Sequence, residues 1–432
     1  MNRANMKPPS RVRVMSPLRD FLGAEASGAI LLAMGAVIAL VWANSPWSDA
    51  YDSLWSSRFA VSVPGGSLDL DLQHWVNDGL MTIFFLVVGL EIKRELTDGH
   101  LAERRSAMLP ALAAVGGMVI PALVYLAIAG STAPQGWAIP VATDIALAVG
   151  VISVAGSRVP ASLRAFLLGL AIVDDIGAIV IIAIFYSTGV KVVWLAISLC
   201  GVLAVVVLKK IGVQKILVYV MVGIVVWLGL YKGGVHPTLA GVIMGLLAPS
   251  TPIGRTELID VEESSSNSGV ESAIVVRERA RGSVSVVEWL EHHLHPWTSF
   301  LIVPVFALAN SGIHISRSVL VDAVGSPITW GVFVGLVVGK PAGILLATKA
   351  SIRFGLADAP DGSSTRQVFG VGSAAGIGFT VAIFITKLAF TDTSQQEVAK
   401  LAILAASILS AGFALVAFIF GASRHEAATR ER

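Results

Sequence analysis

Two adjacent carboxylates, Asp174 and Asp175, lie in the middle of an apolar run from about residue 163 to about residue 185. Such a run can cross a bilayer as one helix, which takes roughly 20 residues. An acid at the bilayer centre costs about 2.5–3.5 kcal/mol on insertion scales, so two of them predict a functional site. Neighbouring residues on a helix point about 100° apart, so one carboxylate can face a water-filled cavity and the other a basic partner.

Lys340 is the candidate for that partner, because it lies midway along another apolar segment, GVFVGLVVGKPAGILLATKA. Its distance from both ends of the segment favours pairing with a buried acid over snorkelling to the interface. Gly335, Gly339 and Gly343 are spaced by four residues. This spacing predicts a flat helix face that admits a close neighbour.

A third intramembrane acid, Asp144, lies in IPVATDIALAVG, next to Thr143 and shortly after Pro140. A proline removes a backbone donor and clashes with the preceding turn, so the freed carbonyls must find other partners. This pattern predicts a helix that is interrupted between Pro140 and Asp144. A simple proline kink with an incidental aspartate is the alternative.

The glycine-rich stretch GVGSAAGIGF predicts a second interrupted helix, around Gly372–Gly378. It lacks the spacing of a dinucleotide-binding loop, and no βαβ unit surrounds it. Discontinuous helices in matching places of two membrane halves mark the midplane site of secondary transporters. We therefore pair this stretch with the region around Asp144.

Histidines and an acid cluster in LEHHLHPW, which contains Glu291, His292, His293 and His295. Their spacing does not match the helix of zinc metalloproteases. They lie at the start of an apolar segment, where a solvated helix cap and a proton-sensing role are both open interpretations. His236, in GGVHPTLAG, leaves the same two interpretations open.

The composition indicates the class of protein. Of the 432 residues, 55% are hydrophobic and 14% are charged, whereas a soluble domain has about 25% charged residues. The mean hydropathy is +0.78. The chain is therefore expected to be a polytopic membrane protein. The single cysteine, Cys200, excludes an internal disulfide framework and a cysteine-based metal cluster.

The predicted fold is an all-α membrane protein with about twelve transmembrane helices. The apolar segments lie at roughly 21–43, 72–95, 108–130, 136–155, 163–185, 192–208, 216–230, 235–248, 286–311, 329–348, 368–388 and 398–421. Several are shorter than the norm of about 20 residues, which predicts some tilted, broken or re-entrant helices. The first segment is too long for a signal-peptide core and lacks a clear cleavage site, so an uncleaved helix is favoured.

These segments divide the chain into five parts. They are a basic N-terminal segment (1–20), a first membrane half with helices 1–8 (21–249), a polar loop (250–284), a second membrane half with helices 9–12 (285–421) and a C-terminal tail (422–432). Lysine and arginine collect in alternate loops, including the 250–284 loop. The positive-inside rule places these loops and both termini in the cytoplasm, so we predict a multi-pass plasma-membrane protein.

The intramembrane acids and lysine can exchange protons near neutral pH. Burial disfavours the charged form of either group, whereas pairing favours it. A hard monovalent cation also binds carboxylate and hydroxyl oxygens, by the same preference that calcium and magnesium show. Protons and cations would then compete for one site, which is antiport in its simplest form.

Eight motifs together resemble the NhaA family of sodium/proton antiporters. They are NDGLMTIFFLVVGLEIKREL, IPVATDIALAVG, LAIVDDIGAIVIIAIFY, GGVHPTLAGV, LHPW, FALANSG, VGKPAGI and GIGFTVAIFI. The resemblance covers about residues 22–421 and implies an inverted repeat with two discontinuous helices that cross at mid-membrane. It also implies a pH-regulated, electrogenic exchange of Na⁺ or Li⁺ for H⁺, with about two H⁺ per Na⁺.

The resemblance implies roles for individual residues. Asp174 and Asp175 are expected to bind Na⁺ and protons, with Thr143 as a further oxygen ligand. Asp144 and Lys340 are expected to compensate the dipoles at the broken helices, and Lys340 also to pair with Asp174. The residues that match the family's pH-regulation positions are Glu91, Arg94, Glu95, His236, Glu291, His292 and His295.

The resemblance implies a transporter and not an enzyme, with no cofactor. Its partners would be Na⁺, Li⁺, H⁺ and the lipid bilayer, with a homodimer left open and no nucleic acid. Two other functions are alternatives. A sodium-coupled organic-solute symporter of related fold would need a larger polar cavity than the sequence indicates. An intramembrane aspartyl hydrolase normally has its acids on separate helices, and the chain has no GxGD sequence.

Overall fold

The structure is a computed structural model that describes residues 17–63, 66–99, 101–187, 189–213, 215–250 and 285–430. Most of the predicted N-terminal segment, nearly all of the polar loop and the last two residues of the tail lie outside the described residues. The described ends of the N-terminal segment and of the tail belong to helices, α1 and α19. The division into two membrane halves stays a prediction.

The described chain up to residue 250 forms helices and one hairpin. Its elements are α1 (Pro17–Ala43), α2 (Ser48–Ser56), β1 (Arg58–Val63), β2 (Gly66–Asp71), α3 (Leu72–His74), η1 (Trp75–Leu80), α4 (Met81–Thr97), α5 (Arg104–Ala129), η2 (Pro134–Val141), α6 (Ile145–Ala155), η3 (Gly156–Arg158), α7 (Ala161–Phe185), α8 (Val192–Ile211), α9 (Ile216–Gly233) and α10 (Leu239–Leu247). Of the η elements, η1 is a π-helix, and η2 and η3 are 3₁₀-helices.

The part from residue 285 onward consists of a second series of helices. Its elements are α12 (Val286–Trp297), η4 (Thr298–Ile302), α13 (Val303–Asn310), α14 (Arg317–Gly325), α15 (Pro327–Val334), η5 (Gly335–Gly339), α16 (Lys340–Arg353), α17 (Thr365–Ala375), α18 (Phe379–Ala389) and α19 (Thr393–Arg430). Both η4 and η5 are π-helices.

Each of the twelve predicted apolar segments contains at least one helix. Within the described ranges, nine helical stretches are long and apolar enough to cross a membrane, and the bent pair α17 and α18 makes a tenth if it acts as one span. The two other segments hold the short α10 and the succession of α12, η4 and α13. The prediction of an all-α polytopic membrane fold is confirmed for this part of the chain, apart from the hairpin.

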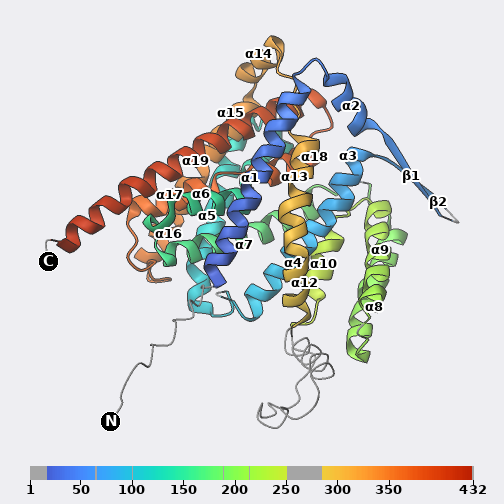
Figure 1. The fold of residues 1–432 in the computed structure, drawn as a ribbon, viewed down its shortest axis with the longest axis horizontal. Helices are drawn as coiled ribbons and strands as arrows, with labels where there is room; N and C mark the ends of the chain where they lie inside the picture. Colours follow the sequence, from blue (N-terminus) through green and yellow to red (C-terminus); the bar gives the residue numbers. More distant parts are fainter. Residues whose placement is uncertain are drawn as a thin grey trace, which may run out of the picture.

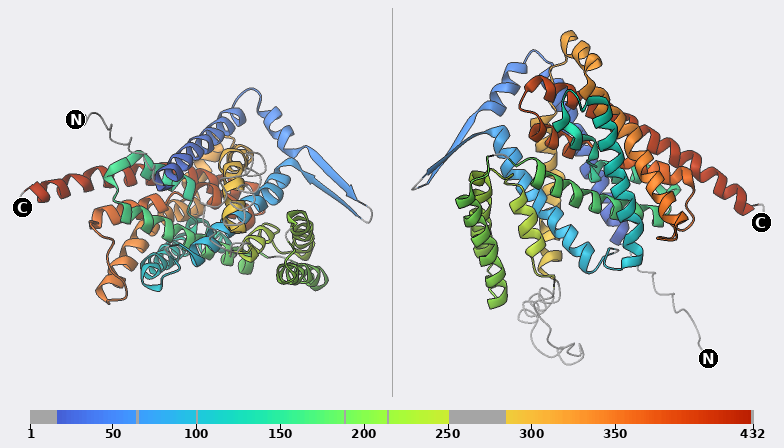
Figure 2. Two further views of the ribbon diagram at one scale, coloured as in Figure 1. Left: turned by 60° about the horizontal axis from the view of Figure 1, so that its bottom comes forward. Right: turned by 180° about the vertical axis from the view of Figure 1, so that it is seen from behind.

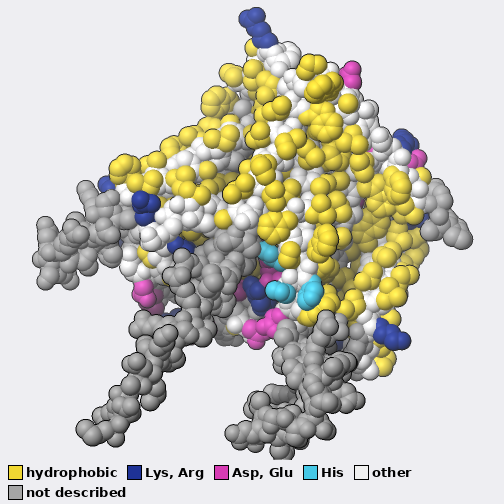
Figure 3. All heavy atoms as spheres, in the orientation of Figure 1, with side chains coloured by type: hydrophobic (Ala, Val, Ile, Leu, Met, Phe, Trp, Pro, Cys, Tyr) yellow, Lys and Arg dark blue, Asp and Glu magenta, His cyan; other side chains and the backbone are white. Residues whose placement is uncertain are grey.

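The helices run between two ends of the molecule (Figure 1). The helices α2 and α14 and the hairpin lie at one end, which we call the hairpin side, and the α4–α5 and α8–α9 connections lie at the opposite end. Two further views show α8 and α9 as a pair at the edge of the bundle (Figure 2). Hydrophobic side chains cover much of the face seen in Figure 3, as a lipid-facing surface requires.

The hairpin is the element that hydrophobic patterning does not predict. Its strands pair antiparallel, with Arg58 opposite Asp71 and Val63 opposite Gly66. Each strand has six residues, and its alternation is a weak signal beside apolar runs of about 20 residues.

Both predicted helix interruptions are confirmed. The first segment starts as the 3₁₀-helix η2, is non-helical from Ala142 to Asp144 and continues as α6. In the second, α17 ends at Ala375, α18 begins at Phe379, and the two helices are bent by 47°. Each break leaves backbone groups without partners in their own helix, and these groups must be satisfied by other elements.

The glycine face predicted from the sequence is also present, because α16 and η5 lie very close to α5. A Cβ atom on Gly343 would lie 2.2 Å from the carbonyl oxygen of Gly116, and one on Gly339 would lie 2.9 Å from the Cα atom of Pro121. Only glycine allows these approaches. Lys340, between the two glycines, is thereby held against α5.

Candidate ion-binding site

The two interrupted segments cross at their breaks. The backbone N–H of Asp144, in the first break, donates to the carbonyl oxygen of Ile377 in the second, over 2.6 Å. The hydroxyl oxygen of Thr143 lies 2.9 Å from the carbonyl oxygen of Ala375, the last residue of α17. The predicted crossing of two discontinuous helices is therefore confirmed.

Asp144 caps the two helices that begin at this crossing. Its Oδ1 accepts the N–H of Leu147 in α6 over 3.0 Å. Its Oδ2 accepts the N–H of Thr380 in α18 over 3.0 Å and lies 2.6 Å from the Thr380 hydroxyl. Helix N-termini carry partial positive charge, so a buried carboxylate shared by two of them is stabilised by both.

Lys340 lies on the other side of the crossing and is 0% exposed. Its Nζ lies 2.6 Å from Oδ2 of Asp174. The same ammonium donates to the carbonyl oxygen of Val141, at the end of η2. A helix C-terminus carries partial negative charge, so the lysine complements both the carboxylate and the broken helix end.

Asp174 is 1% exposed, and its two oxygens have different surroundings. Oδ2 is shared by Lys340 and by the hydroxyl of Thr143, which is 2.6 Å away. Oδ1 is buried and has no hydrogen-bond partner among the described residues. One oxygen of this carboxylate therefore has unused capacity to accept a proton or to bind a cation.

Asp175, the next residue on α7, is 8% exposed. It interacts electrostatically with Asp174 and Lys340, and also with Glu91 of α4. Within the described residues, no hydrogen bond joins Asp175 to a side chain of the crossing. The two carboxylates thus serve different neighbours, as their positions on a helix predict.

Five of the seven residues expected from family resemblance to regulate pH response gather between α4 and α12. Arg94 forms an ion pair with Glu291, and Nε2 of His295 lies 3.9 Å from Oε1 of Glu91. Glu95 is buried on the same helix as Arg94 and interacts with Glu291. Figure 3 shows histidine side chains beside acidic and basic ones on this part of the surface.

The other two lie apart. His292 is exposed, and its ring lies 5.6 Å from that of His293. His236 lies between α9 and α10, where its Nδ1 is 2.8 Å from the hydroxyl of Thr238 and its Nε2 is 3.7 Å from Oδ1 of Asp78. The sequence did not single out Asp78 or Thr380, although Asp78 belongs to the quoted motif NDGL and Thr380 directly follows GIGF.

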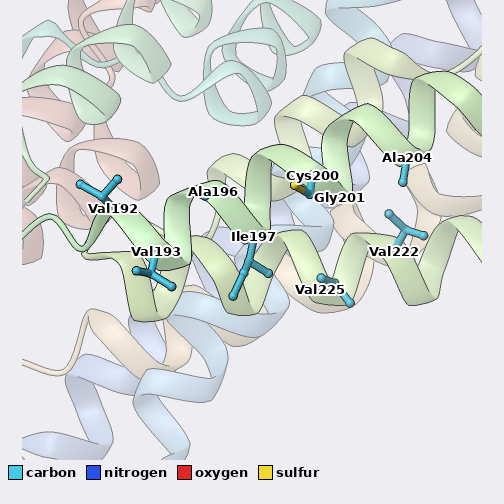
Figure 4. A pocket seen from close by; sticks show the side chains of 9 residues that line it. All are labelled: Val192, Val193, Ala196, Ile197, Cys200, Gly201, Ala204, Val222 and Val225. Atoms are coloured by element: carbon cyan, nitrogen blue, oxygen red, sulfur yellow. The ribbon is translucent and has the colours of Figure 1, made fainter.

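An apolar groove of about 680 Å³ lies elsewhere, between α8 and α9 (Figure 4). Residues such as Val193, Ile197 and Val225 line it, together with Cys200. It offers no charged ligand, so we place the candidate site at the crossing and not in this groove.

The crossing suits a small monovalent cation better than a tightly held transition metal. Among the described residues, no three His, Cys, Asp or Glu side chains are arranged to hold a metal ion. The crossing instead offers carboxylate, hydroxyl and carbonyl oxygens, which are the ligands that hard cations prefer. A lysine already occupies one carboxylate oxygen, so a cation and an ammonium would compete there.

The sequence matches the family described as Na⁺/H⁺ antiporter 1 over residues 19–418. The Na⁺/H⁺ antiporter NhaA 3 of Frankia alni is 43% identical over 416 residues, which cover 94% of this chain and 89% of that protein. The Na⁺/H⁺ antiporter NhaA 2 of Myxococcus xanthus is 45% identical over 415 residues, which cover 93% of this chain and 88% of that protein.

A solved structure of a sodium proton antiporter from Methanocaldococcus jannaschii aligns with 93% of this chain and 98% of its own, with 14% identity and a TM-score of 0.48. The match to the family covers both interrupted segments, the acid pair on α7 and Lys340. This chain therefore belongs to the Na⁺/H⁺ antiporter 1 family.

Proposed function

We propose that this protein exchanges Na⁺ or Li⁺ for H⁺ across the plasma membrane. The observation that carries the proposal is the crossing of two interrupted helices, where Asp174, Lys340 and Thr143 meet in a buried site. Family membership and the two Na⁺/H⁺ antiporter relatives support it.

In this proposal Asp174 and Asp175 hold either protons or the cation. In the sodium-free state the ammonium of Lys340 neutralises Asp174, a role that the 2.6 Å contact between the two groups supports. An arriving Na⁺ takes oxygens from Asp174, Asp175 and Thr143 and displaces the ammonium. Because a buried lysine without its counter-ion is unfavourable, Lys340 then releases a proton.

The cycle moves net charge if two protons leave for each Na⁺ that binds. In the route above the protons come from Asp175 and Lys340. A second route, in which Asp174 is protonated and both acids release their protons, gives the same net charge of one per cycle. Thr143 supplies an uncharged oxygen and does not alter that count.

We also propose a role for the fixed charges around the site. Asp144 and Lys340 offset the dipoles of the helices that begin or end at the crossing. Their side chains also bond to backbone groups that the breaks leave without a partner in their own helix. The α4–α12 group with Arg94, Glu291 and His295 is our candidate for pH regulation, because it places the imidazole of His295 3.9 Å from a carboxylate oxygen of Glu91, beside the ion pair of Arg94 and Glu291.

The basic loops at the end opposite the hairpin support an orientation with that end in the cytoplasm, together with both termini and the 250–284 loop. The hairpin side would then face outward.

The test is sodium uptake into proteoliposomes. Purified protein is reconstituted, a pH step is imposed with no organic solute present, and radioactive sodium is followed. We expect uptake in wild type and in the exposed control Asp322→Asn, and none in Asp175→Asn, which keeps the shape of the side chain and loses its charge. Uptake that needs an added organic solute would instead support a symporter, and normal exchange by Asp175→Asn would overturn the assignment of that acid.

A further inference from the structure

The apolar groove between α8 and α9 lies outside the ion site, on the part of the bundle that is least covered by other helices. Of the residues in the 18-residue apolar stretches of α8 and α9, only 17% and 22% are buried, the lowest values among the nine candidate spans of the described chain. The groove is lined by aliphatic side chains, a glycine and Cys200. A hydrocarbon chain can fill such a groove by van der Waals packing.

The groove follows α8 for more than three turns (Figure 4). Its long wall contains a row of residues spaced by four, Val192, Ala196, Cys200 and Ala204. Residues four apart lie on one helix face, so the row runs along the helix. Val222 and Val225 of α9 line the facing wall. Ala204 lies twelve residues after Val192, which is about 18 Å of helix.

The lysines at the two ends of α8 place the groove in one leaflet. Lys191 directly precedes the helix, and Lys209, 18 residues later, lies in its last turn. The two are about 27 Å apart along the helix, close to the hydrocarbon thickness of about 30 Å. The α8–α9 connection lies opposite the hairpin (Figure 1), so the groove begins at the hairpin side. It ends near the bilayer midplane, as one acyl chain does.

Two ammonium groups lie at the hairpin-side end of the groove. Lys191 is exposed, and its backbone N–H donates to the carbonyl oxygen of Gly233 over 3.0 Å, so the start of α8 lies beside the end of α9. Lys232 lies in the last turn of α9, seven residues after Val225 and on the same helix face. Its Nζ is 4.7 Å from the ring centre of Trp194. Tryptophan is typical of the membrane–water interface, so this cation lies at headgroup level.

These lysines have no acidic partner in their part of the chain. The sequence contains no Asp or Glu between Asp175 and Glu257. Among the described residues, no carboxylate oxygen lies within 4.0 Å of the ammonium of Lys191 or Lys232. Both charges are therefore available to an anion at the membrane surface.

We propose that this groove binds an anionic phospholipid of the hairpin-side leaflet. One acyl chain lies along the α8 wall, and Lys232 and Lys191 bind the phosphate-bearing headgroup. The length of the groove matches one leaflet, and the headgroup charge is complementary to the two lysines. A zwitterionic lipid has the same chains but no net charge, so it gains less from the lysines.

The test is photo-crosslinking in phosphatidylcholine vesicles that contain a trace of phosphatidylglycerol with a diazirine in one acyl chain. Illumination attaches the lipid to residues that its chain touches, and mass spectrometry of peptides locates them. We expect attachment to groove residues of α8 and α9. Unlabelled phosphatidylglycerol should compete for this attachment, and extra phosphatidylcholine should not. Phosphatidylcholine with the same diazirine chain should attach there at least fivefold less.

Matched variants separate the headgroup contact from the groove. Lys232→Gln should reduce attachment about fivefold, the equivalent of about 1 kcal/mol for one lysine near an anionic lipid, and Lys232→Arg should resemble wild type. Arg317→Gln removes an exposed cation at the same side of the molecule and is the control. Ala196→Phe fills the groove and should abolish attachment, whereas Leu199→Phe, on the same helix but outside the groove, should not.

Equal attachment of the two diazirine lipids, or attachment spread evenly around both helices, would indicate ordinary surrounding lipid and overturn the proposal. A groove that stays unlabelled while the rest of α8 is labelled would mean that a second copy of the chain covers it, and this would overturn the proposal as well. If Lys232→Gln fails to reach the membrane, Lys191→Gln and the competition in wild type decide instead, because unchanged attachment in both excludes a headgroup site.

Discussion

At the scale of single residues, the proposed ion site is a pairing of one lysine with one of two acids. Asp174 has one oxygen engaged by Lys340 and Thr143 and one oxygen without a partner in the described chain. Asp175 interacts electrostatically with Glu91 as well as with Asp174 and Lys340, so it has a different set of neighbours. The two acids therefore have different surroundings, although they are adjacent in the sequence, and the proposed exchange gives them separate roles.

Lys340→Ala is expected to lower both thermal stability and transport. Removal of one member of a buried ion pair costs about 3–5 kcal/mol, because the remaining charge is left uncompensated. The measurement is thermal unfolding in detergent, with the exposed Lys349→Ala on the same helix as the control. An unchanged melting temperature for Lys340→Ala would mean that Asp174 does not depend on this lysine in the resting state.

At the scale of elements, the site exists because two helices stop in the same place. Proline and non-helical backbone interrupt one segment, and glycines interrupt the other. One carboxylate, that of Asp144, then satisfies backbone N–H groups at the starts of both α6 and α18. A side chain can cap two helices only when their N-termini meet.

Thr380→Val should destabilise this junction. The valine has nearly the same shape, but it removes the hydroxyl that lies 2.6 Å from Asp144, and a lost bond to a buried charged group costs about 1–3 kcal/mol. The control is Thr386→Val in the same helix, whose hydroxyl bonds only to the carbonyl of Ala382. Unfolding in detergent and sodium-dependent proton release should both be affected in Thr380→Val. Equal melting of the two variants would contradict the assigned role of Thr380.

Gly343→Ala tests the contact between α16 and α5. The added methyl group would lie 2.2 Å from the carbonyl oxygen of Gly116, so the helices must separate, and such overpacking costs about 1–3 kcal/mol. Because Lys340 lies one turn away, transport should fall as well. Gly412→Ala, where a Cβ atom meets nothing within 4 Å, is the matched control. If both variants have the same melting temperature and the same transport rate, the close approach of α16 to α5 is not needed for stability or transport.

At the scale of the whole molecule, the proposed cycle should respond to membrane potential and fail at acidic pH. If one net charge crosses the membrane in each cycle, a potential of 100 mV changes the free energy of the cycle by about 2.3 kcal/mol. Proteoliposomes clamped at zero potential with valinomycin and potassium, and then at either sign, measure this effect on sodium flux. A flux that ignores the potential would indicate one-for-one exchange and exclude the two-proton scheme.

The sign of the pH effect follows from the acids. As the pH falls, protons occupy Asp174 and Asp175 and exclude the cation, so exchange declines on the acidic side. The titrations of these groups are coupled, so the midpoint belongs to the site as a whole. Full activity that persists below the range in which carboxylates titrate would contradict the competition of protons and Na⁺ for one site.

The sequence by itself determined the membrane class, the positions of the apolar segments and the two helix breaks. These features depend on local properties, namely run length, proline and glycine placement and the unfavourable burial of charge, which a single sequence displays. It also singled out Asp144, Asp174 and Lys340, because charges inside apolar runs stand out without any knowledge of the fold.

Only the tertiary structure decided which residues meet. The residue pattern suggested Lys340 as a partner for an acid, and the family resemblance named Asp174. That contact and the one with Val141 form because of the way α5, α7 and α16 pack. The double capping by Asp144 and the separation of His236 from the α4–α12 group were not visible in the sequence. Contacts between segments hundreds of residues apart follow from packing, and no local pattern encodes them.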